Sequence, residues 1–343
     1  MRGNTVLRKL LIITVIVGAL AIAALSWIHQ QLNQPLNIQQ RQLFTLAQGK
    51  GAIATLYQFD QNNWLPMPVE LARLWLKVSY SGNPVKAGTY YLDPPLTLAD
   101  ALHTLSTGDE AQFDISLIEG QTLKQWLAVI SAHPRIDNDL DKNFASLINE
   151  LLTQWQVYSA QPLRSTEGLF LADTYHFTAN TEATAILRRA SGAMQAFVLD
   201  GWQNRPPGLP YDKPVDVLTM ASIIEKETAL PEERQRIAGV FVNRLEQNMR
   251  LQTDPTVIYG IGEKFDGNLT REHLRQPTPY NTYVHRGLPP GPIAMVGRAA
   301  INAALAPAVT DELYFVSRGD GSHQFSVTLA EHNKAVRQYQ LNQ

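Results

Sequence analysis

The feature that most constrains this chain is an uncharged, mainly apolar run near its N-terminus, at residues 10–28. Its length is close to the roughly 20 residues that a helix needs to cross a bilayer. Three basic residues precede the run, and the next one along the chain is Arg41. Because positive charge marks the cytoplasmic side of a membrane segment, we expect residues 1–9 to be cytoplasmic and the body to lie across the membrane.

A cleaved secretory signal is the competing interpretation of this run. Ala21-Ile22-Ala23 offers a small-residue cleavage pattern. The apolar run nevertheless continues past that site through Trp27 and Ile28. This favours a retained single-pass anchor.

Composition narrows the class of function. The chain has 343 residues, 45% of them hydrophobic, which is enough for two compact units beyond the anchor. A formal net charge of −2 gives no basic field for a phosphate backbone, so we expect no nucleic acid partner. There is no cysteine, and the eight histidines show no metal-binding spacing. Phosphate-loop, dinucleotide and serine-hydrolase motifs are also absent from the sequence. We therefore expect no metal and no cofactor.

The remainder of the chain divides by composition into three parts. Residues 29–43 are rich in Gln and Asn and predict a solvated spacer. Residues 44–138 mix strand and helix signals and predict a small α/β subdomain. Residues 139–343 are mainly helical and predict a larger domain. The fold class is therefore α+β with helix dominant.

The small subdomain contains two similar strand-helix successions. A strand at 88–92 precedes a helix at 97–106, and a strand at 115–118 precedes a helix at 122–130. Both helices begin with Thr-Leu. They are either paired repeat units or two unrelated segments with a common capping residue.

Amphipathic patterns predict four long helices in the larger domain, and turn residues predict a hairpin close to its end. The helices are expected near residues 144–155, 181–199, 215–228 and 231–247. Gly319-Asp320-Gly321-Ser322 separates the two hairpin strands, and a last helix follows from Leu329.

One of these helices places a carboxylate on its apolar face. Glu227 lies three and four residues after Ile224 and Ile223, so it projects from the same side as they do. Burial of a carboxyl group raises its pKa, and a protonated glutamate can act as a general acid at neutral pH. The structural alternative is an ion pair with an arginine. The candidates for that partner are Arg234, Arg236 and Arg244.

Several sequence motifs resemble those of a known family. They are Met220–Thr228, Val240–Leu245, Met249–Gly260, Tyr280–Tyr283 and Gly287–Ile293. In this order, and together with the N-terminal anchor, they make the chain similar to the YceG-like family of endolytic murein transglycosylases. The resemblance covers nearly the whole chain.

The resemblance implies that the catalytic glutamate is the one followed by Thr228, which selects Glu227 over Glu225. It also implies a LysM-like small subdomain and a lysozyme-like catalytic domain. The sequence departs from the family around Leu169–Tyr175, which lacks a proline and carries an extra apolar residue. That departure puts the local loop in doubt.

The implied activity is that of a lyase, which cleaves the MurNAc-GlcNAc bond of nascent peptidoglycan and leaves 1,6-anhydro-MurNAc ends. A single glutamate suffices if the C6 hydroxyl of the muramic acid is the nucleophile. The implied location is the inner membrane with the body in the periplasm, where the protein would terminate glycan strands near peptidoglycan synthases. The alternatives are a non-catalytic, membrane-anchored peptidoglycan-binding protein and a hydrolytic muramidase.

Amide, hydroxyl and aromatic side chains around the glutamate are candidates for binding the glycan. They are Gln252, Thr253, Asp254, Tyr259, Tyr280, Asn281, Thr282, Tyr283 and, less directly, Glu167. Asp254 before Pro255 is more typical of a helix cap than of a catalytic group. Tyr280 and Tyr283 could equally be core residues. His323 is expected to be an exposed residue of the hairpin turn, with a place in the cleft as the alternative.

Overall fold

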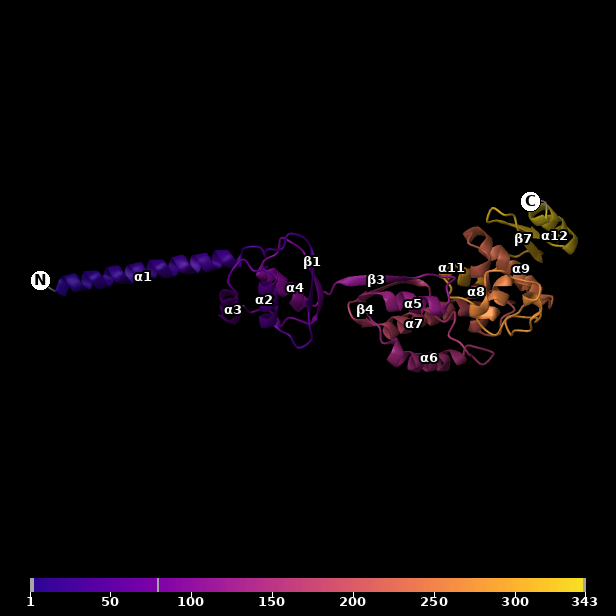
Figure 1. Ribbon diagram of the computed structural model, residues 1–343, viewed down its shortest axis with the longest axis horizontal. Coiled ribbons are helices and arrows are strands. Elements are labelled where there is room, and N and C mark those ends of the chain that lie inside the picture. The colour runs from indigo at the N-terminus through magenta and orange to yellow at the C-terminus, as the bar shows by residue number, and fades with distance from the viewer. Residues whose placement is uncertain (1–2, 79, 342–343) are drawn as a thin grey trace. The chain divides into compact units, whose positions relative to one another are not determined.

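The computed structural model describes residues 3–78 and 80–341, so the first two of the nine expected cytoplasmic residues lie outside the described residues. The chain divides into two compact units, Met1–Phe113 and Asp114–Gln343. This division precedes the expected boundary near residue 138, because most of strand β3 and the helix after it belong to the second unit. Strand β3 (Gln112–Leu117), which is labelled in Figure 1, pairs with β5 (Asp173–Thr178) in the second unit.

The N-terminal helix α1 runs from Gly3 to Leu32. Its segment Leu10–Leu32 is long and apolar enough to cross a membrane, and most of the side chains described there are exposed, with Ile28, Gln31 and Leu32 partly buried. A signal sequence would meet the same criteria. Helix α1 ends at Leu32, four residues beyond the apolar run at residues 10–28.

The first unit is built on a two-stranded antiparallel sheet. Strand β1 pairs with β2, so that Phe44 lies opposite Tyr90. The elements in chain order are β1 (Gln42–Leu46), α2 (Ala52–Gln61), α3 (Val69–Val78), β2 (Gly88–Leu92) and α4 (Leu98–Thr107). Phe44, Phe59 and Trp64 meet in its core, with ring centroids 5.0–6.2 Å apart.

The expected spacer at 29–43 is partly wrong. Leu36 and Ile38 are only 3% and 6% exposed and belong to the core of the first unit. The amide of Leu36 donates to the carbonyl of Leu96 at 2.8 Å. Two apolar residues are too few to raise the hydrophobicity of a polar segment, yet they are enough to hold it against the core.

The two strand-helix successions share capping chemistry only. Thr97 caps α4 and Thr122 caps α5 (Leu123–Ala132), each through a reciprocal capping box with the residue three places on. However, β2 pairs with β1, whereas β3 pairs with β5. The two segments therefore lie in different sheets and different units, as expected of unrelated segments with a common cap.

The second unit is dominated by helices, as the sequence predicted. Three further small sheets accompany them: β3–β5, β4–β6 and the antiparallel hairpin β7–β8. After α5 its main elements are β4 (Ile136–Asp137), α6 (Leu140–Gln156), β5, β6 (Thr181–Glu182), α7 (Ala183–Gln203), α8 (Pro214–Glu227), η1 (Pro231–Glu233), α9 (Arg234–Glu246), α10 (Asp254–Ile261), α11 (Arg298–Leu305), β7 (Tyr314–Ser317), β8 (His323–Ser326), α12 (Leu329–Val336) and η4 (Arg337–Leu341).

The segment Leu169–Tyr175, which departs from the family pattern, is held in place by buried side chains and main-chain hydrogen bonds. Leu169, Phe170 and Leu171 are buried, and the amide of Leu171 donates to the carbonyl of Ala190 at 3.1 Å. Gly168 precedes them with φ +71, and a Cβ there would lie 2.3 Å from Pro292. A tight glycine contact thus fixes the position of this loop.

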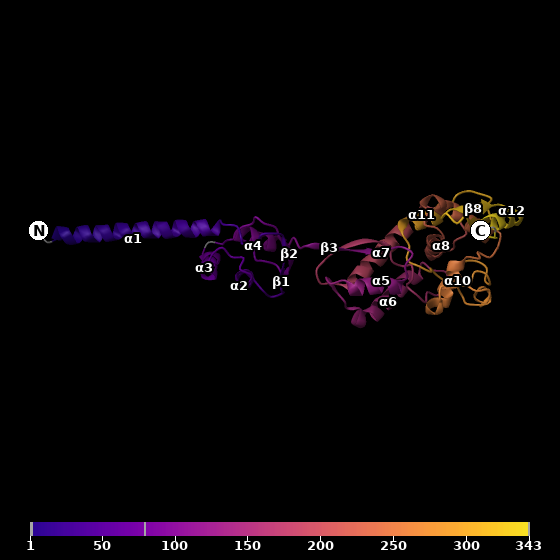
Figure 2. The same cartoon turned by 45° about the horizontal axis from the view of Figure 1, so that its top comes forward.

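Helix α8 is the centre of the second unit. It packs against α7, α9, α10 and α11, and Figure 2 shows it beside α11. Pro214 starts the helix, and the Asp216 carboxylate accepts the amides of Asp212 and Lys213, both at 2.9 Å. Every residue from Val217 to Ile224 is buried. The expected amphipathic pattern is therefore wrong, because this helix is enclosed on all sides.

Ser222 connects α8 to the segment before α11. It is fully buried, and its Oγ accepts the amide of Ile293 at 2.9 Å and donates to the carbonyl of Thr219 at 2.7 Å. Replacing Ser222 with Ala leaves that buried N–H without an acceptor, so we expect a loss of about 1–3 kcal/mol in the free energy of unfolding. Denaturant titration measures it. The exposed Ser116→Ala control should change stability far less, and an equal effect of both would contradict this account.

Candidate active site

Glu227 is the last residue of α8 and is partly buried. The helix ends there because Thr228 adopts an extended conformation, with ψ 138, and the 3-10 turn η1 follows from Pro231. The two side chains that precede Glu227 in the helix have other partners. Glu225 accepts the amide of Gly297 at 3.2 Å, and the Lys226 ammonium donates to the carbonyl of Gly120 at 3.1 Å. The helical spacing correctly separated Glu227 from both neighbours.

Glu227 faces a cavity of about 600 Å³. The walls come from the ends of α8 and α9, the loop before α10, the hairpin β7–β8 and α12. The lining residues include Glu227, Arg244, Leu251, Gln252, Thr253, Asp254, Tyr283, Tyr314, His323, His332, Asn333 and Gln340. The cavity thus combines a carboxyl group with amides, hydroxyls, aromatic rings and imidazoles.

The carboxyl group is held by a hydroxyl. Thr253 Oγ1 donates to Glu227 Oε1 in a short hydrogen bond. The residue before it, Gln252, has φ 52, a left-handed conformation that is uncommon for a residue other than glycine. Its amide donates to the carbonyl of Thr282 at 3.2 Å, which holds the reversed chain in place. This local strain turns the Thr253 side chain toward Glu227.

Burial raises the pKa of Glu227 to about 7. The hydrogen bond from Thr253 opposes this rise because it stabilises the ionised form, and the nearby negative charge of Asp254 adds to the rise. Electrostatic interaction with His323 and Arg244 lowers the pKa. At neutral pH the group is therefore present in both protonated and ionised forms.

The three arginines that could have paired with Glu227 have other partners. Arg234 pairs with Glu225, with Nη2 3.6 Å from Oε1. Arg236 pairs with Glu312. Arg244 donates to main-chain carbonyls, and no ion pair to Glu227 is present among the residues that the structure describes. The structural alternative therefore applies to Glu225 and not to Glu227.

Arg244 organises the walls of the cavity. Its Nε donates to the carbonyl of Leu313 at 2.6 Å, and its Nη1 donates to the carbonyl of Leu251 at 2.7 Å. The neighbouring Asn243 amide donates to the carbonyls of Thr310 and Glu312, at 2.6 and 2.9 Å. Two adjacent residues of α9 thus hold both the loop that carries Thr253 and the start of the hairpin.

Four of the predicted binding residues meet Glu227 at this cavity: Gln252, Thr253, Asp254 and Tyr283. The expected helix start is displaced by one residue, because Thr253 occupies the cap position and Asp254 is the first residue of α10. The Asp254 carboxylate accepts the hydroxyl of Tyr283 at 2.6 Å. Asp254 and Tyr283 therefore form one wall together.

Asn281 and Thr282 are 0% and 2% exposed, so their side chains lie beneath the cavity surface. The Asn281 amide donates to the carbonyl of Gln276 at 2.7 Å, and its Oδ1 accepts the amide of Tyr283 at 2.9 Å. Thr282 Oγ1 accepts the amide of Thr253 at 3.1 Å. Asn281 thus fixes the main chain at Tyr283, and Thr282 fixes the main chain at Thr253.

Glu167, Tyr259 and Tyr280 form a second cluster. The rings of Tyr259 and Tyr280 lie 4.8 Å apart, and Glu167 accepts the Tyr259 hydroxyl and the amide of Leu123, the latter at 2.8 Å. Burial raises the pKa of Glu167 to about 7. Glu167 and Tyr280 line a separate cavity of about 370 Å³. The structure therefore does not bring this cluster into the Glu227 cavity.

The expectation of an exposed His323 is wrong. Its side chain is 11% exposed, lines the cavity and contacts Glu233. Tyr314, His332, Asn333 and Gln340 were not predicted at the site. The turn signal located the hairpin in the sequence. It carried no information on the packing of that hairpin against α9.

Comparison with known proteins decides the family. Residues 44–338 match the YceG-like family. This chain is a member of the YceG-like family. An endolytic murein transglycosylase of Bacillus subtilis is 32% identical over 283 residues, which are 76% of this chain and 75% of the relative.

More distant relatives agree. An endolytic murein transglycosylase of Streptococcus pneumoniae is 27% identical over 282 residues, 74% of this chain and 51% of the relative. This member of the family therefore matches about half of the pneumococcal protein. The crystal structure of a YceG-like protein of Listeria monocytogenes aligns with a TM-score of 0.54 and 28% identity, covering 87% of this chain and 100% of that one.

The raised pKa of Glu227 has a consequence for stability. In the unfolded chain a glutamate has a pKa near 4.5, whereas in the fold Glu227 has a pKa of about 7. The favourable contribution of the protonated form is thus complete below pH 4.5 and is lost as the pH rises through 7. Glu227→Gln cannot ionise, so relative to the wild type it should gain about 3 kcal/mol between pH 4 and pH 8. Unfolding at both pH values measures this, and a difference that does not change with pH would contradict it.

Proposed function

We propose that this chain is an endolytic lytic transglycosylase that cleaves the MurNAc-GlcNAc bond of peptidoglycan, with Glu227 as its catalytic acid. The observation that carries this proposal is a partly buried carboxyl group, with a pKa of about 7, that faces a cavity of about 600 Å³. The activity of the relatives named above points to the same substrate.

The reaction needs one proton delivered and one removed. Glu227 donates its proton to the leaving glycosidic oxygen, and the C6 hydroxyl of the muramic acid attacks C1 to form a 1,6-anhydro end. In the simplest form the same carboxylate then takes the hydroxyl's proton. Asp254 is the one other carboxylate among the described lining residues, and it is bound by the Tyr283 hydroxyl. An intramolecular nucleophile removes the need for a second catalytic carboxylate.

The glycan is expected to contact the cavity through Gln252, Thr253, Asp254 and Tyr283, which lie beside Glu227. The remaining candidates do not line this cavity. Asn281 and Thr282 support this wall, while Tyr259, Tyr280 and Glu167 offer a further contact at the second cavity.

The two units suit the two tasks that the family resemblance implies. We assign a LysM-like, glycan-binding role to the first unit, supported by its two-stranded antiparallel sheet with two helices between the strands. The second unit takes the role of a lysozyme-like catalytic domain, supported by a carboxyl group at the end of its central helix. Tethering by α1 would confine cleavage to newly made strands close to the inner membrane. There the protein would act as a strand terminase beside the synthases.

Substitution of the catalytic glutamate tests the activity. Glu227→Gln preserves shape and removes the acid, so we expect cleavage of purified glycan strands to fall by a factor of about 100 or more. Mass spectrometry of the wild-type fragments should show anhydro ends, and fragments one water heavier would indicate a muramidase. The inactive variant should still sediment with peptidoglycan. Cells that carry it should contain longer strands.

Glu225→Gln is the matched control. It changes the same side chain two residues earlier, where the carboxylate is bound to Arg234 and Gly297 instead of facing the cavity. This variant should retain cleavage. If both variants cleave as the wild type does, Glu227 is not the acid. If the wild type sediments with peptidoglycan and never shortens strands, the protein is a non-catalytic binder.

The anchor and its orientation can be tested by labelling, because the chain contains no cysteine. We expect a cysteine at exposed Lys142 to react with a membrane-impermeant maleimide in spheroplasts, and one at Asn4 to react only after permeabilisation. Loss of residue 4 from the mature protein would instead identify a cleaved signal.

A further inference from the structure

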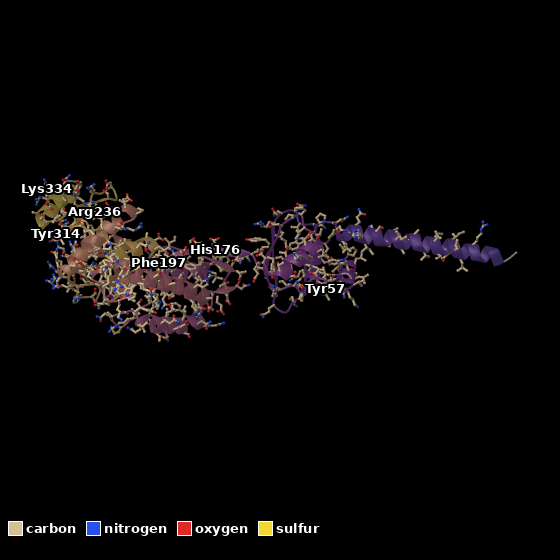
Figure 3. All side chains as sticks on the ribbon, turned by 180° about the vertical axis from the view of Figure 1, so that it is seen from behind. Tyr57, His176, Phe197, Arg236, Tyr314 and Lys334 are labelled. Atoms are coloured by element: carbon tan, nitrogen blue, oxygen red, sulfur yellow. The ribbon has the colours of Figure 1, made fainter. Side chains whose placement is uncertain are left out.

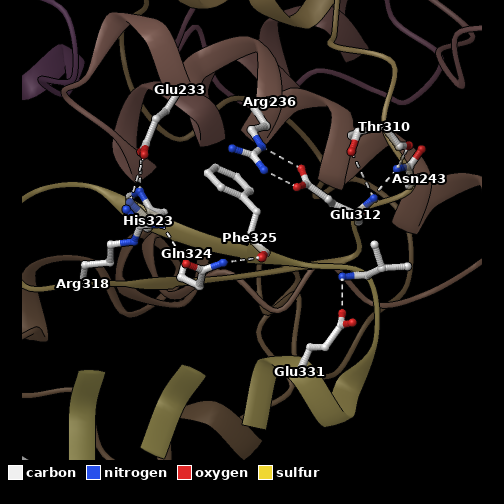
Figure 4. A network of polar contacts seen from close by, with 11 residues as sticks. Glu233, Arg236, Asn243, Thr310, Glu312, Arg318, His323, Gln324, Phe325 and Glu331 are labelled. Carbon is white, nitrogen blue, oxygen red and sulfur yellow. Dashed lines mark hydrogen bonds and ion pairs between the residues drawn. The ribbon is translucent and has the colours of Figure 1, made fainter. Parts of the chain in front are cut away.

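His323 is held by a carboxylate on two sides. Its ring Nδ1 lies 2.7 Å from Glu233 Oε2, and its main-chain amide donates to Glu233 Oε1 at 2.9 Å (Figure 4). The two side chains are 11% and 13% exposed. Glu233 belongs to η1, which is the next element after α8 in the chain. The carboxylate therefore fixes both the backbone and the ring of His323.

Aromatic rings fix the plane of the imidazole. Phe315 meets it edge to face, with centroids 5.4 Å apart, and Phe325 lies 6.3 Å away. A ring confined in this way loses little further freedom when it acts on a substrate. Enzymes that activate a nucleophile through a histidine use a similar arrangement. In them a carboxylate bound to one ring nitrogen determines whether the other ring nitrogen accepts or donates a proton.

The same ring lines the cavity that Glu227 faces. With Nδ1 directed at Glu233, Nε2 remains as the second ring nitrogen, and within residues 3–78 and 80–341 no hydrogen-bond partner for it is present. His323 is also close enough to influence the charge of Glu227. The cavity therefore contains a second group able to exchange a proton.

We propose that His323 is the catalytic base that removes the proton from the C6 hydroxyl, and that Glu233 is its positioning residue. This inference rests on the proposed function and divides the two proton transfers between two residues. The Glu233 carboxylate accepts Nδ1–H, which leaves the lone pair on Nε2 free to accept a proton.

The step balances as follows. The C6 oxygen forms a bond to C1 while the bond from C1 to the leaving oxygen breaks. The Glu227 proton goes to the leaving oxygen, and the C6 hydroxyl proton goes to Nε2. Glu227 ends ionised and His323 ends as imidazolium, so one proton must pass through solvent from His323 to Glu227 before the next cycle.

Several titratable or charged groups face this imidazole or share its cavity, and they will shape its pH dependence. They are Glu233 from η1, Glu227 from α8, Arg244 from α9, Asp254 from α10, His332 from α12, and Tyr283 and Tyr314. Glu233 is the one that contacts the ring directly. Its substitution should therefore change the pH profile most selectively.

The first test compares kcat and KM on uncrosslinked glycan strands, using the full chain in detergent. Glutamine can donate and accept hydrogen bonds and cannot take up a proton, so His323→Gln should lower kcat by about 100-fold with little change in KM. His176→Gln is the matched control. His176 is exposed on β5, at the opposite end of the second unit from Tyr314 in Figure 3, and its variant should behave as the wild type.

The second test is the pH profile of Glu233→Gln. Glu233→Gln removes the negative charge beside the imidazole, and a negative charge there favours the protonated ring. A base must be deprotonated, and the limb on which activity rises with pH should therefore move to lower pH. A merely structural role of Glu233 would lower activity without moving that limb.

Chemical rescue covers the case in which the glutamine variant folds poorly. His323→Ala leaves room beside Glu233, and added imidazole should restore kcat in proportion to its unprotonated fraction. Cleavage by His323→Gln within about threefold of the wild type, with an unchanged pH profile, would overturn the proposal. In that case an inactive Glu227→Gln leaves the proposed function standing with one acid-base residue, whereas an active one removes both.

Discussion

The site depends on the hydrogen bonds that the buried guanidinium of Arg244 donates to main-chain carbonyls. It binds the carbonyls of Leu251 and Leu313, which belong to segments more than sixty residues apart in the sequence. Because buried carbonyls without partners are costly, these bonds hold the loop and the hairpin against α9. The same positive charge lies near Glu227 and opposes the effect of burial on its pKa. One side chain thus shapes the cavity and limits how far burial raises the pKa of Glu227.

Two glutamates two residues apart show how surroundings assign different tasks to the same side chain. Glu225 meets Arg234 and the amide of Gly297, a setting that links α8 to its neighbours. Glu227 meets a hydroxyl from Thr253 and opens into a cavity. Burial raises the pKa of both, but Glu227 is the one with access to a substrate. Access, more than pKa, therefore separates the structural carboxylate from the reactive one.

Local chemistry predicted much of the fold. Thr97 and Thr122 marked the starts of helices, and the glycine-rich turn marked the hairpin. The sequence did not predict that α8 is enclosed on every side, because enclosure depends on four other helices. The first strand and the helices α2 and α3 were not resolved individually, since their patterns are short and weakly periodic.

The candidate site was predictable to the extent that it is local. Glu227 was found from its helical spacing, and Gln252, Thr253, Asp254 and Tyr283 from their proximity in the motif series. Asn281 and Thr282 were expected to contact the glycan, but both side chains are buried. A polar residue next to a binding residue can face inward and hold the backbone, and the sequence does not distinguish the two cases. His323 was misplaced for a related reason, since its partner Glu233 lies ninety residues earlier in the chain.

The order of the walls along the chain also has a consequence for biosynthesis. Glu227 is synthesised before the hairpin and α12, which help to enclose its cavity. A polypeptide that lacks these later elements has its carboxyl group without the surrounding wall that excludes solvent. The raised pKa of Glu227 therefore depends on segments that are synthesised after it.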